Sequence, residues 1–182
     1  MKKTMSFVLP LLFVLVFSAA AYAADVAITS VGQSSDGMMV KVLMKKLKID
    51  PDYDALMKPE ALTDQKVLIA VVGGSSKGLG AAGINKDDEK ARGQAVIDAA
   101  KKKGMKVIIM HVGGEGRRGD LSDMFITAVT KLGDRVIVVK SGNLDKIFDK
   151  SKAPEAELIE ADNIQATVTP LEEAFKDYGV TR

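Results

Sequence analysis

The chain of 182 residues contains no cysteine and only one histidine, His111. The missing cysteine excludes disulfide bonds, thiol catalysis and thiolate metal sites. A single imidazole excludes a zinc site built from several histidines and leaves at most one histidine for acid–base catalysis. A domain without disulfides must be stabilised by its own hydrophobic core, and a chain of this length can form one.

The apolar stretch at residues 7–17 is too short for a membrane-spanning helix, which needs about 20 apolar residues. It follows Lys2 and Lys3 and precedes the A-x-A motif at residues 21–23, the three-part pattern of a secretory signal peptide. An uncleaved membrane anchor is the alternative. We predict cleavage after residue 23, export to the periplasm or the cell exterior, no stable membrane anchor afterwards, and a single α/β domain at residues 24–182.

The mature chain has no excess of charge of either sign. Removing the two lysines of the signal peptide from 26 basic residues leaves 24, which equals the 24 acidic residues. A neutral protein offers no electrostatic reason to expect a nucleic acid or an anionic membrane as partner.

Runs rich in valine and isoleucine alternate with amphipathic segments. The predicted strands are 26–31, 66–72, 105–112, 134–140 and, more weakly, 156–161. The predicted helices are 37–49, 85–104, 121–133 and 169–179. This alternation predicts a doubly wound α/β domain, Rossmann-like or flavodoxin-like, with a roughly five-stranded parallel sheet and helices on both faces. It does not determine the strand order.

Local signals mark where the helices begin. Asn85, Ser122 and Thr169 are the predicted N-caps, and Thr169 with Glu172 has the spacing of a capping box. In the first helix, Met39 is expected on the packing stripe, together with Val40, Leu43, Met44 and Leu47. Residues 48–65 are expected to form a long connection with one short helix.

The loops that follow the predicted strands are rich in glycine and polar residues, whereas the loops at the other end of the sheet are short. Ligands of open parallel sheets bind beyond the carboxyl ends of the strands, so the sequence predicts one polar, glycine-lined pocket there. Glycine, serine and asparagine that merely form turns are the alternative. The candidate ligand-binding residues are Gln33, Ser34, Ser35, Gly74, Ser75, Ser76, Lys77, Gly78, Gly113, Gly114, Arg117, Arg118, Asp120, Asp123 and Asn143.

The block GGSSKGLGAAG at residues 73–83 resembles the cofactor loop of short-chain dehydrogenases, because Gly74, Gly78 and Gly80 match its G-x-x-x-G-x-G spacing. The resemblance implies a nicotinamide dinucleotide. However, the predicted helix starts only near Asn85, and the Tyr-x-x-x-Lys motif of that family is absent. We therefore predict no cofactor and keep an NADP-dependent oxidoreductase as an alternative.

The loop HVGGEGRRGDLSD at residues 111–123 combines one histidine with two adjacent arginines. Arg117 and Arg118 suit bidentate capture of a carboxylate or phosphate, or they pair with the acidic residues of their own loop. His111 is a candidate general base, or else a half-buried histidine bonded to backbone.

Four sequence blocks identify a family resemblance: ITSVGQSSD (28–36), GGSSKGLGAAGI (73–84), HVGGEGRRGDLSD (111–123) and VVKSGNLDKIF (138–148). Together they resemble an uncharacterised, domain-of-unknown-function family of small exported bacterial proteins. The resemblance implies a secreted bacterial α/β protein and no particular activity.

The favoured hypothesis is an exported protein that binds a small anionic ligand in the loops after the strands. A hydrolase or transferase that uses His111 as base is one alternative, and a structural or partner-binding envelope protein is another. Whether the protein is an enzyme, and its oligomeric state, stay open at this point.

Overall fold

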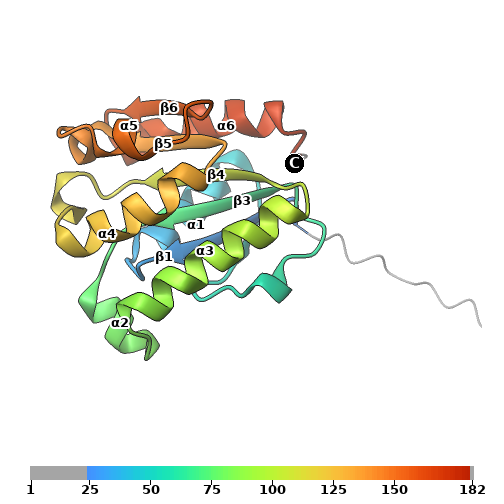
Figure 1. Ribbon diagram of the computed structural model, residues 1–182. Helices are drawn as coiled ribbons and strands as arrows, with labels where there is room; N and C mark the ends of the chain where they lie inside the picture. Colours follow the sequence, from blue (N-terminus) through green and yellow to red (C-terminus); the bar gives the residue numbers. More distant parts are fainter. Residues whose placement is uncertain (1–23, 181–182) are drawn as a thin grey trace, which may run out of the picture.

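A computed structural model describes residues 24–180, and it is built around one open, six-stranded sheet in which all strands are parallel (Figure 1). The strand order is β2-β1-β3-β4-β5-β6. The strands are β1 (Val26–Val31), β2 (Asp52–Tyr53), β3 (Val67–Val72), β4 (Lys106–His111), β5 (Arg135–Val139) and β6 (Glu157–Ala161). The predicted signal peptide lies outside the described residues.

The predicted α/β class and parallel sheet are confirmed, but the sheet has one strand more than expected. The additional strand β2 falls in the segment that was predicted as a connection, where Asp52 and Tyr53 pair with Ala27 and Ile28 of β1. Two residues are too few to produce a recognisable alternating pattern, so the sequence carried no signal for this strand.

Helices cover both faces of the sheet. The helices are α1 (Asp36–Met44), α2 (Ser76–Ala82), α3 (Lys86–Lys102), α4 (Asp120–Val129), α5 (Ile147–Ser151) and α6 (Val168–Asp177). Short 3-10 turns are η1 (Lys45–Leu47), η2 (Pro59–Ala61), η3 (Glu115–Arg117), η4 (Thr130–Leu132), η5 (Lys140–Asn143) and η6 (Ile164–Thr167). Apolar residues of α1 and α6 form a core on one face, and those of α2 to α5 form a second core on the other face (Figure 1).

The central strands are mostly apolar because both of their faces are covered. Along β1, Ala27 and Val31 pack into the core beneath α3, whereas Val26 and Ile28 pack into the core beneath α1. All six residues of β3 are fully buried. Successive side chains of a strand point to opposite faces, so a strand buried on both sides contains a continuous apolar run.

Two of the three predicted helix caps are wrong. Asn85 is confirmed, since its side chain accepts hydrogen bonds from the backbone N–H groups of Asp87 and Asp88. Ser122 lies inside α4, where its Oγ accepts a hydrogen bond from the N–H of Gly74 at 2.8 Å. Thr169 lies inside α6, because η6, capped by Asn163, runs directly into that helix.

The glycine block also begins a helix earlier than predicted. Helix α2 starts at Ser76 and is capped by the Ser75 side chain, which accepts a hydrogen bond from the N–H of Gly78. It ends at Ala82 and is followed by Gly83, which has a positive φ of 65°. A side chain at Gly78 would place its Cβ 1.9 Å from the carbonyl oxygen of Gln33. Gly78 therefore allows α2 to pack directly on the loop after β1.

This packing predicts opposite effects for two neighbouring alanine substitutions. Gly78→Ala is expected to lower the free energy of unfolding by about 1–3 kcal/mol, because backbone must move to admit the methyl group. Gly80→Ala is the matched control, since no atom lies within 4 Å of its added Cβ. It is expected to stabilise the protein by about 0.4–1 kcal/mol. Urea unfolding measures both, and equal effects of the two substitutions would contradict the described packing.

Candidate functional site

A polar cavity at the carboxyl ends of the strands lies between the loops that follow β1, β2 and β3. It has a volume of about 700 Å³. We call it the β1–β3 groove, and its lining residues are Gln33, Ser34, Ser35, Asp54, Ala55, Leu56, Ser75, Lys77, Gly78, Ala81, Ala82 and Arg117. The chain leaves β1 towards β2 on one side and returns to β3 on the other, and such reversals of strand order are where open α/β sheets bind ligands.

Seven of the predicted ligand-binding residues line this groove: Gln33, Ser34, Ser35, Ser75, Lys77, Gly78 and Arg117. The loops after β1 and β3 are joined by backbone hydrogen bonds, from the N–H of Ser34 to the carbonyl of Gly73 and from the N–H of Ser75 to the carbonyl of Gly32. These two hydrogen bonds fix the loops after β1 and β3 relative to each other at the groove.

The loop after β1 has a left-handed backbone, with φ of 99° at Gly32 and 59° at Gln33. Positive φ is unfavourable for a residue with a side chain, so surrounding contacts must hold Gln33 in place. Gln33 forms an antiparallel bridge with Gly74, and its side-chain amide donates to the carbonyl of Ala55 and to Glu89. The side-chain N–H groups of Gln33 are therefore used within the protein and are not available to a ligand.

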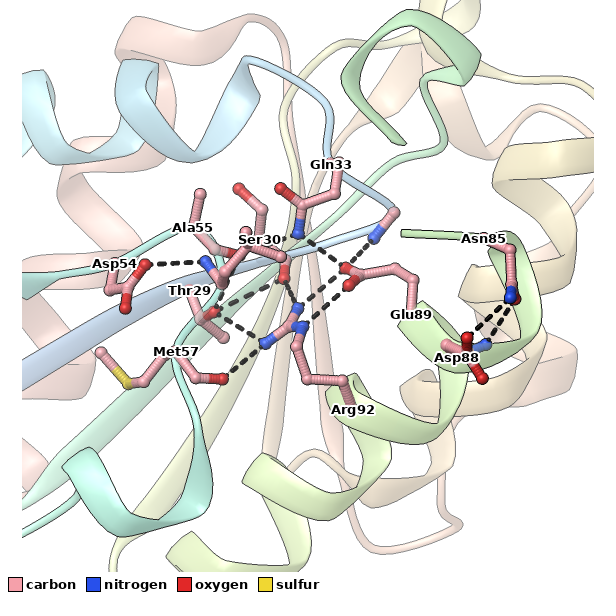
Figure 2. Close-up of polar contacts among 12 residues, drawn as sticks. Thr29, Ser30, Gln33, Asp54, Ala55, Met57, Asn85, Asp88, Glu89 and Arg92 are labelled. Carbon is pink, nitrogen blue, oxygen red and sulfur yellow. Dashed lines mark hydrogen bonds and ion pairs between the residues drawn. The ribbon is translucent and has the colours of Figure 1, made fainter. Parts of the chain in front are cut away.

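A buried ion pair between Glu89 and Arg92 of α3 contacts the loop after β1 (Figure 2). The Glu89 side chain is fully buried, and its Oε1 accepts hydrogen bonds from the N–H of Gly32, from Nε2 of Gln33 and from Nη2 of Arg92, at 2.8–2.9 Å. Its Oε2 accepts from Nε of Arg92 at 2.8 Å. Arg92 also donates to the carbonyl of Met57. One carboxylate thus connects α3 to the strained loop and to the segment after β2.

Glu89 was not among the candidate residues predicted from the sequence. A signal for burial was present, because Glu89 shares one helix face with Gly93, Val96, Ile97 and Ala100, all of which are buried. A lone acid on the apolar stripe of a helix indicates a buried partner, which here is Arg92.

Arg117 enters the groove with much of its hydrogen-bonding capacity unused. Its Nε lies 3.4 Å from Oδ1 of Asp36, whose side chain is only 1% exposed. Among the described residues, neither Arg117 Nε nor the two Asp36 carboxylate oxygens have a hydrogen-bond partner, although all three atoms are buried. The Arg117 side chain is 35% exposed, so its terminal nitrogens are within reach of a ligand.

The lack of a side chain at Gly113 leaves room for the charged side chains of Arg117 and Asp36. A Cβ at Gly113 would lie 2.4 Å from Cβ of Arg117 and 2.7 Å from Oδ2 of Asp36. Gly114 has a φ of 59° and begins the turn η3, which carries Arg117. These two predicted residues thus shape the site through their backbone and do not line the groove. Gly74 acts similarly, since a Cβ there would collide with Leu121 and Ser122 of α4.

His111 is fully buried and does not line the groove. Its Nδ1 lies 3.0 Å from the carbonyl oxygen of Val72 and its Nε2 lies 3.2 Å from that of Gly114, while its ring packs against Phe148. This geometry agrees with the alternative of a histidine bonded to backbone. Its use as a general base stays a prediction.

Arg118, unlike Arg117, uses its side-chain donors in hydrogen bonds within the protein. It forms paired hydrogen bonds with the carboxylates of Asp123 and Asp145, at 2.7–3.0 Å. Hydrogen bonding from Arg118 lowers the pKa of Asp145 from 3.8 to about 2. Asn143 is likewise buried, and its amide donates to Asp149 and Glu160. These contacts join the loops after β4 and β5.

The remaining predicted residues lie away from the groove. Ser76 and Asp120 are exposed, and Asp120 and Asp123 line a shallow surface hollow between α3 and α4. Within residues 24–180, no three acidic or histidine side chains are grouped closely enough to hold a metal ion. Nor does that part of the chain contain a helix both long and apolar enough to cross a membrane.

Together, the parallel sheet and the groove at its reversal point define an α/β protein with a ligand-sized polar cavity. Residues 23–175 match the family described as a domain of unknown function (DUF6305), and the chain belongs to that family. This confirms the predicted membership of an uncharacterised domain family. No curated protein and no solved structure matches the chain.

The Glu89–Arg92 pair predicts a large loss of stability on removal of one charge. Glu89→Gln leaves Arg92 buried without its counter-ion, and we expect the free energy of unfolding to fall by about 3–5 kcal/mol. Lys90→Gln is the control, because Lys90 makes only a long, exposed contact with Asp87 and its loss should cost less than about 0.5 kcal/mol. Chemical denaturation compares them. A loss at Glu89 as small as that at Lys90 would refute the anchoring role.

The contact between Arg118 and Asp145 predicts a pH dependence. Because the folded-state pKa of Asp145 is depressed from 3.8 to about 2, its stabilising contribution is complete above about pH 4 and is lost as the pH falls through 2. Carbon-13 NMR titration of the Asp145 carboxyl should show a midpoint near 2, shifted back towards 3.8 in Arg118→Gln. Arg117→Gln should leave that midpoint in place. A wild-type midpoint at the unfolded value would disprove the contact.

Proposed function

We propose that this protein is an exported binding protein that holds a small anionic molecule in the β1–β3 groove. The observation that carries the proposal is Arg117, whose terminal nitrogens have no hydrogen-bond partner among the described residues while its side chain lines the groove. A guanidinium with free donors binds carboxylate or phosphate in a bidentate manner.

Other groups of the groove suit the same ligand. Lys77 is exposed at the start of α2 and has no ionic partner among residues 24–180, so it adds a second positive charge. Ser34, Ser35 and Ser75 bring hydroxyl groups, which can donate hydrogen bonds to anionic oxygens. Asp36 balances the charge of Arg117 in the absence of a ligand, and this balance keeps the empty groove from being strongly cationic.

The strand order of the sheet also supports ligand binding in the groove. The order β2-β1-β3-β4-β5 supports a doubly wound sheet of the flavodoxin-like type, in which ligands bind at the β1/β3 reversal point. Export rests on the N-terminal pattern of two lysines, an apolar stretch and an A-x-A motif.

Isothermal titration calorimetry with inorganic phosphate, succinate and NADP tests the proposal. Arg117→Lys keeps a positive charge beside Asp36 but removes the planar fork, and we expect it to weaken anion binding at least about tenfold. Lys103→Gln, an exposed lysine at the opposite end of the strands, is the charge control and should bind as the wild type does.

Equal affinities of the two variants would contradict the proposed site. Preferential binding of NADP over phosphate and succinate would instead favour the oxidoreductase alternative. Native mass spectrometry of the protein purified from its exported location, without added ligand, would then identify the mass of any bound molecule.

A further inference from the structure

A second cavity, apolar in character, lies next to the β1–β3 groove. It has a volume of about 350 Å³ and lies between α1 and η6. We call it the α1 hollow, and it is lined by Ser35, Met38, Met39, Val42, Leu43, Ile164 and Gln165. Gln165, one of these lining residues, accepts a hydrogen bond from Lys46.

The α1 hollow collects most of the exposed apolar side chains. Four large hydrophobic residues are strongly exposed in the described part of the chain, and three of them line it: Met38 at 47%, Met39 at 44% and Val42 at 54%. The sequence predicted Met39 on the packing stripe of its helix, which is wrong. The buried apolar side chains of α1 are Val40, Leu43 and Met44, whereas Met39 is exposed.

The two cavities meet at one residue. Ser35, which immediately precedes α1, is exposed and lines both of them. The groove on one side of Ser35 is lined by the cationic Arg117 and Lys77, and also by Asp54, whose carboxylate accepts a hydrogen bond from the N–H of Leu56. The other side is an apolar surface with two methionines. A molecule that fills both must therefore have an anionic end and a hydrocarbon end.

We propose that the ligand of this protein is a monomeric anionic amphiphile, with its charged head in the β1–β3 groove and its alkyl chain in the α1 hollow. The inference rests on the proposed anion binding and specifies the class of ligand. The helix rises about 1.5 Å per residue, so the seven steps from Ser35 to Val42 span roughly 10 Å, which suits a chain of medium length. Methionine side chains adapt to flexible apolar ligands, because they are unbranched and polarizable.

A homologous series of straight-chain carboxylates, from butyrate to decanoate and below their micelle-forming concentrations, tests the proposal by calorimetry. Full burial of one methylene strengthens binding about fourfold, so partial burial in an open hollow should give about twofold to threefold per methylene. The double variant Met38→Ser/Met39→Ser should flatten this dependence while leaving butyrate affinity unchanged. Leu144→Ser, which removes the fourth exposed hydrophobic side chain, should leave the dependence intact.

The outcomes separate this inference from the proposed function. Butyrate binding with no gain along the series would overturn the amphiphile and leave the anion site standing. Failure of phosphate, succinate and every carboxylate to bind would remove the anion site itself. A chain-length dependence that survives in the methionine variant would place the alkyl chain elsewhere.

Two further results would also overturn the proposal. Sedimentation with anionic phospholipid vesicles, without binding of monomeric carboxylates, would assign the methionines to a membrane surface. Self-association of the wild type that is lost in the methionine variant would assign them to a contact between copies of the chain. Thermal melts confirm that each variant is folded before it is titrated.

Discussion

The buried ion pair between Glu89 and Arg92 holds the loop on which the β1–β3 groove is built. Taking two charges out of water is costly, and the cost is offset only when hydrogen bonds satisfy the buried atoms. Here both carboxylate oxygens of Glu89 accept hydrogen bonds, and Arg92 donates to backbone carbonyls as well. The pair keeps Gln33 at a positive φ, and Gln33 in turn bridges Gly74 in the neighbouring loop. The contacts that shape the groove are thus made within the protein itself, and in the proposed function such preorganisation would lower the entropic cost of binding.

Two charged pairs near the groove differ in how completely their polar atoms are hydrogen-bonded. Glu89 and Arg92 are fully hydrogen-bonded, whereas Asp36 and Arg117 face each other across 3.4 Å with buried atoms unsatisfied. Buried polar atoms are nearly always paired in folded proteins, so this pair at the edge of the groove is an exception. The apolar surface on the other side of Ser35 is a similar exception, since α1 exposes side chains that a helix usually buries.

The sequence predicted those parts of the fold that depend on local pattern. The five longer strands, the cap at Asn85 and the gathering of the loops that line the β1–β3 groove follow from hydrophobic periodicity, helix termini and the geometry of parallel sheets. Contacts between distant residues could not be predicted in this way. Ser122 was expected to cap its own helix, but its hydroxyl bonds to Gly74, 48 positions earlier in the chain. Arg117 and Arg118 are adjacent and chemically identical, yet Arg117 lines the groove whereas Arg118 pairs with two aspartates. This difference depends on the backbone conformation at η3, which the sequence pattern does not reveal.

The central claim is that Arg117 binds the anionic group of a ligand. NMR of the arginine side-chain Nε–H groups tests it most directly, because each arginine gives its own signal. During titration with octanoate, the account predicts a saturable shift of the Arg117 signal, while the signals of Arg118 and Arg92 stay in place, since both are already hydrogen-bonded within the protein. An unchanged Arg117 signal at octanoate concentrations that saturate the protein by calorimetry would contradict the account.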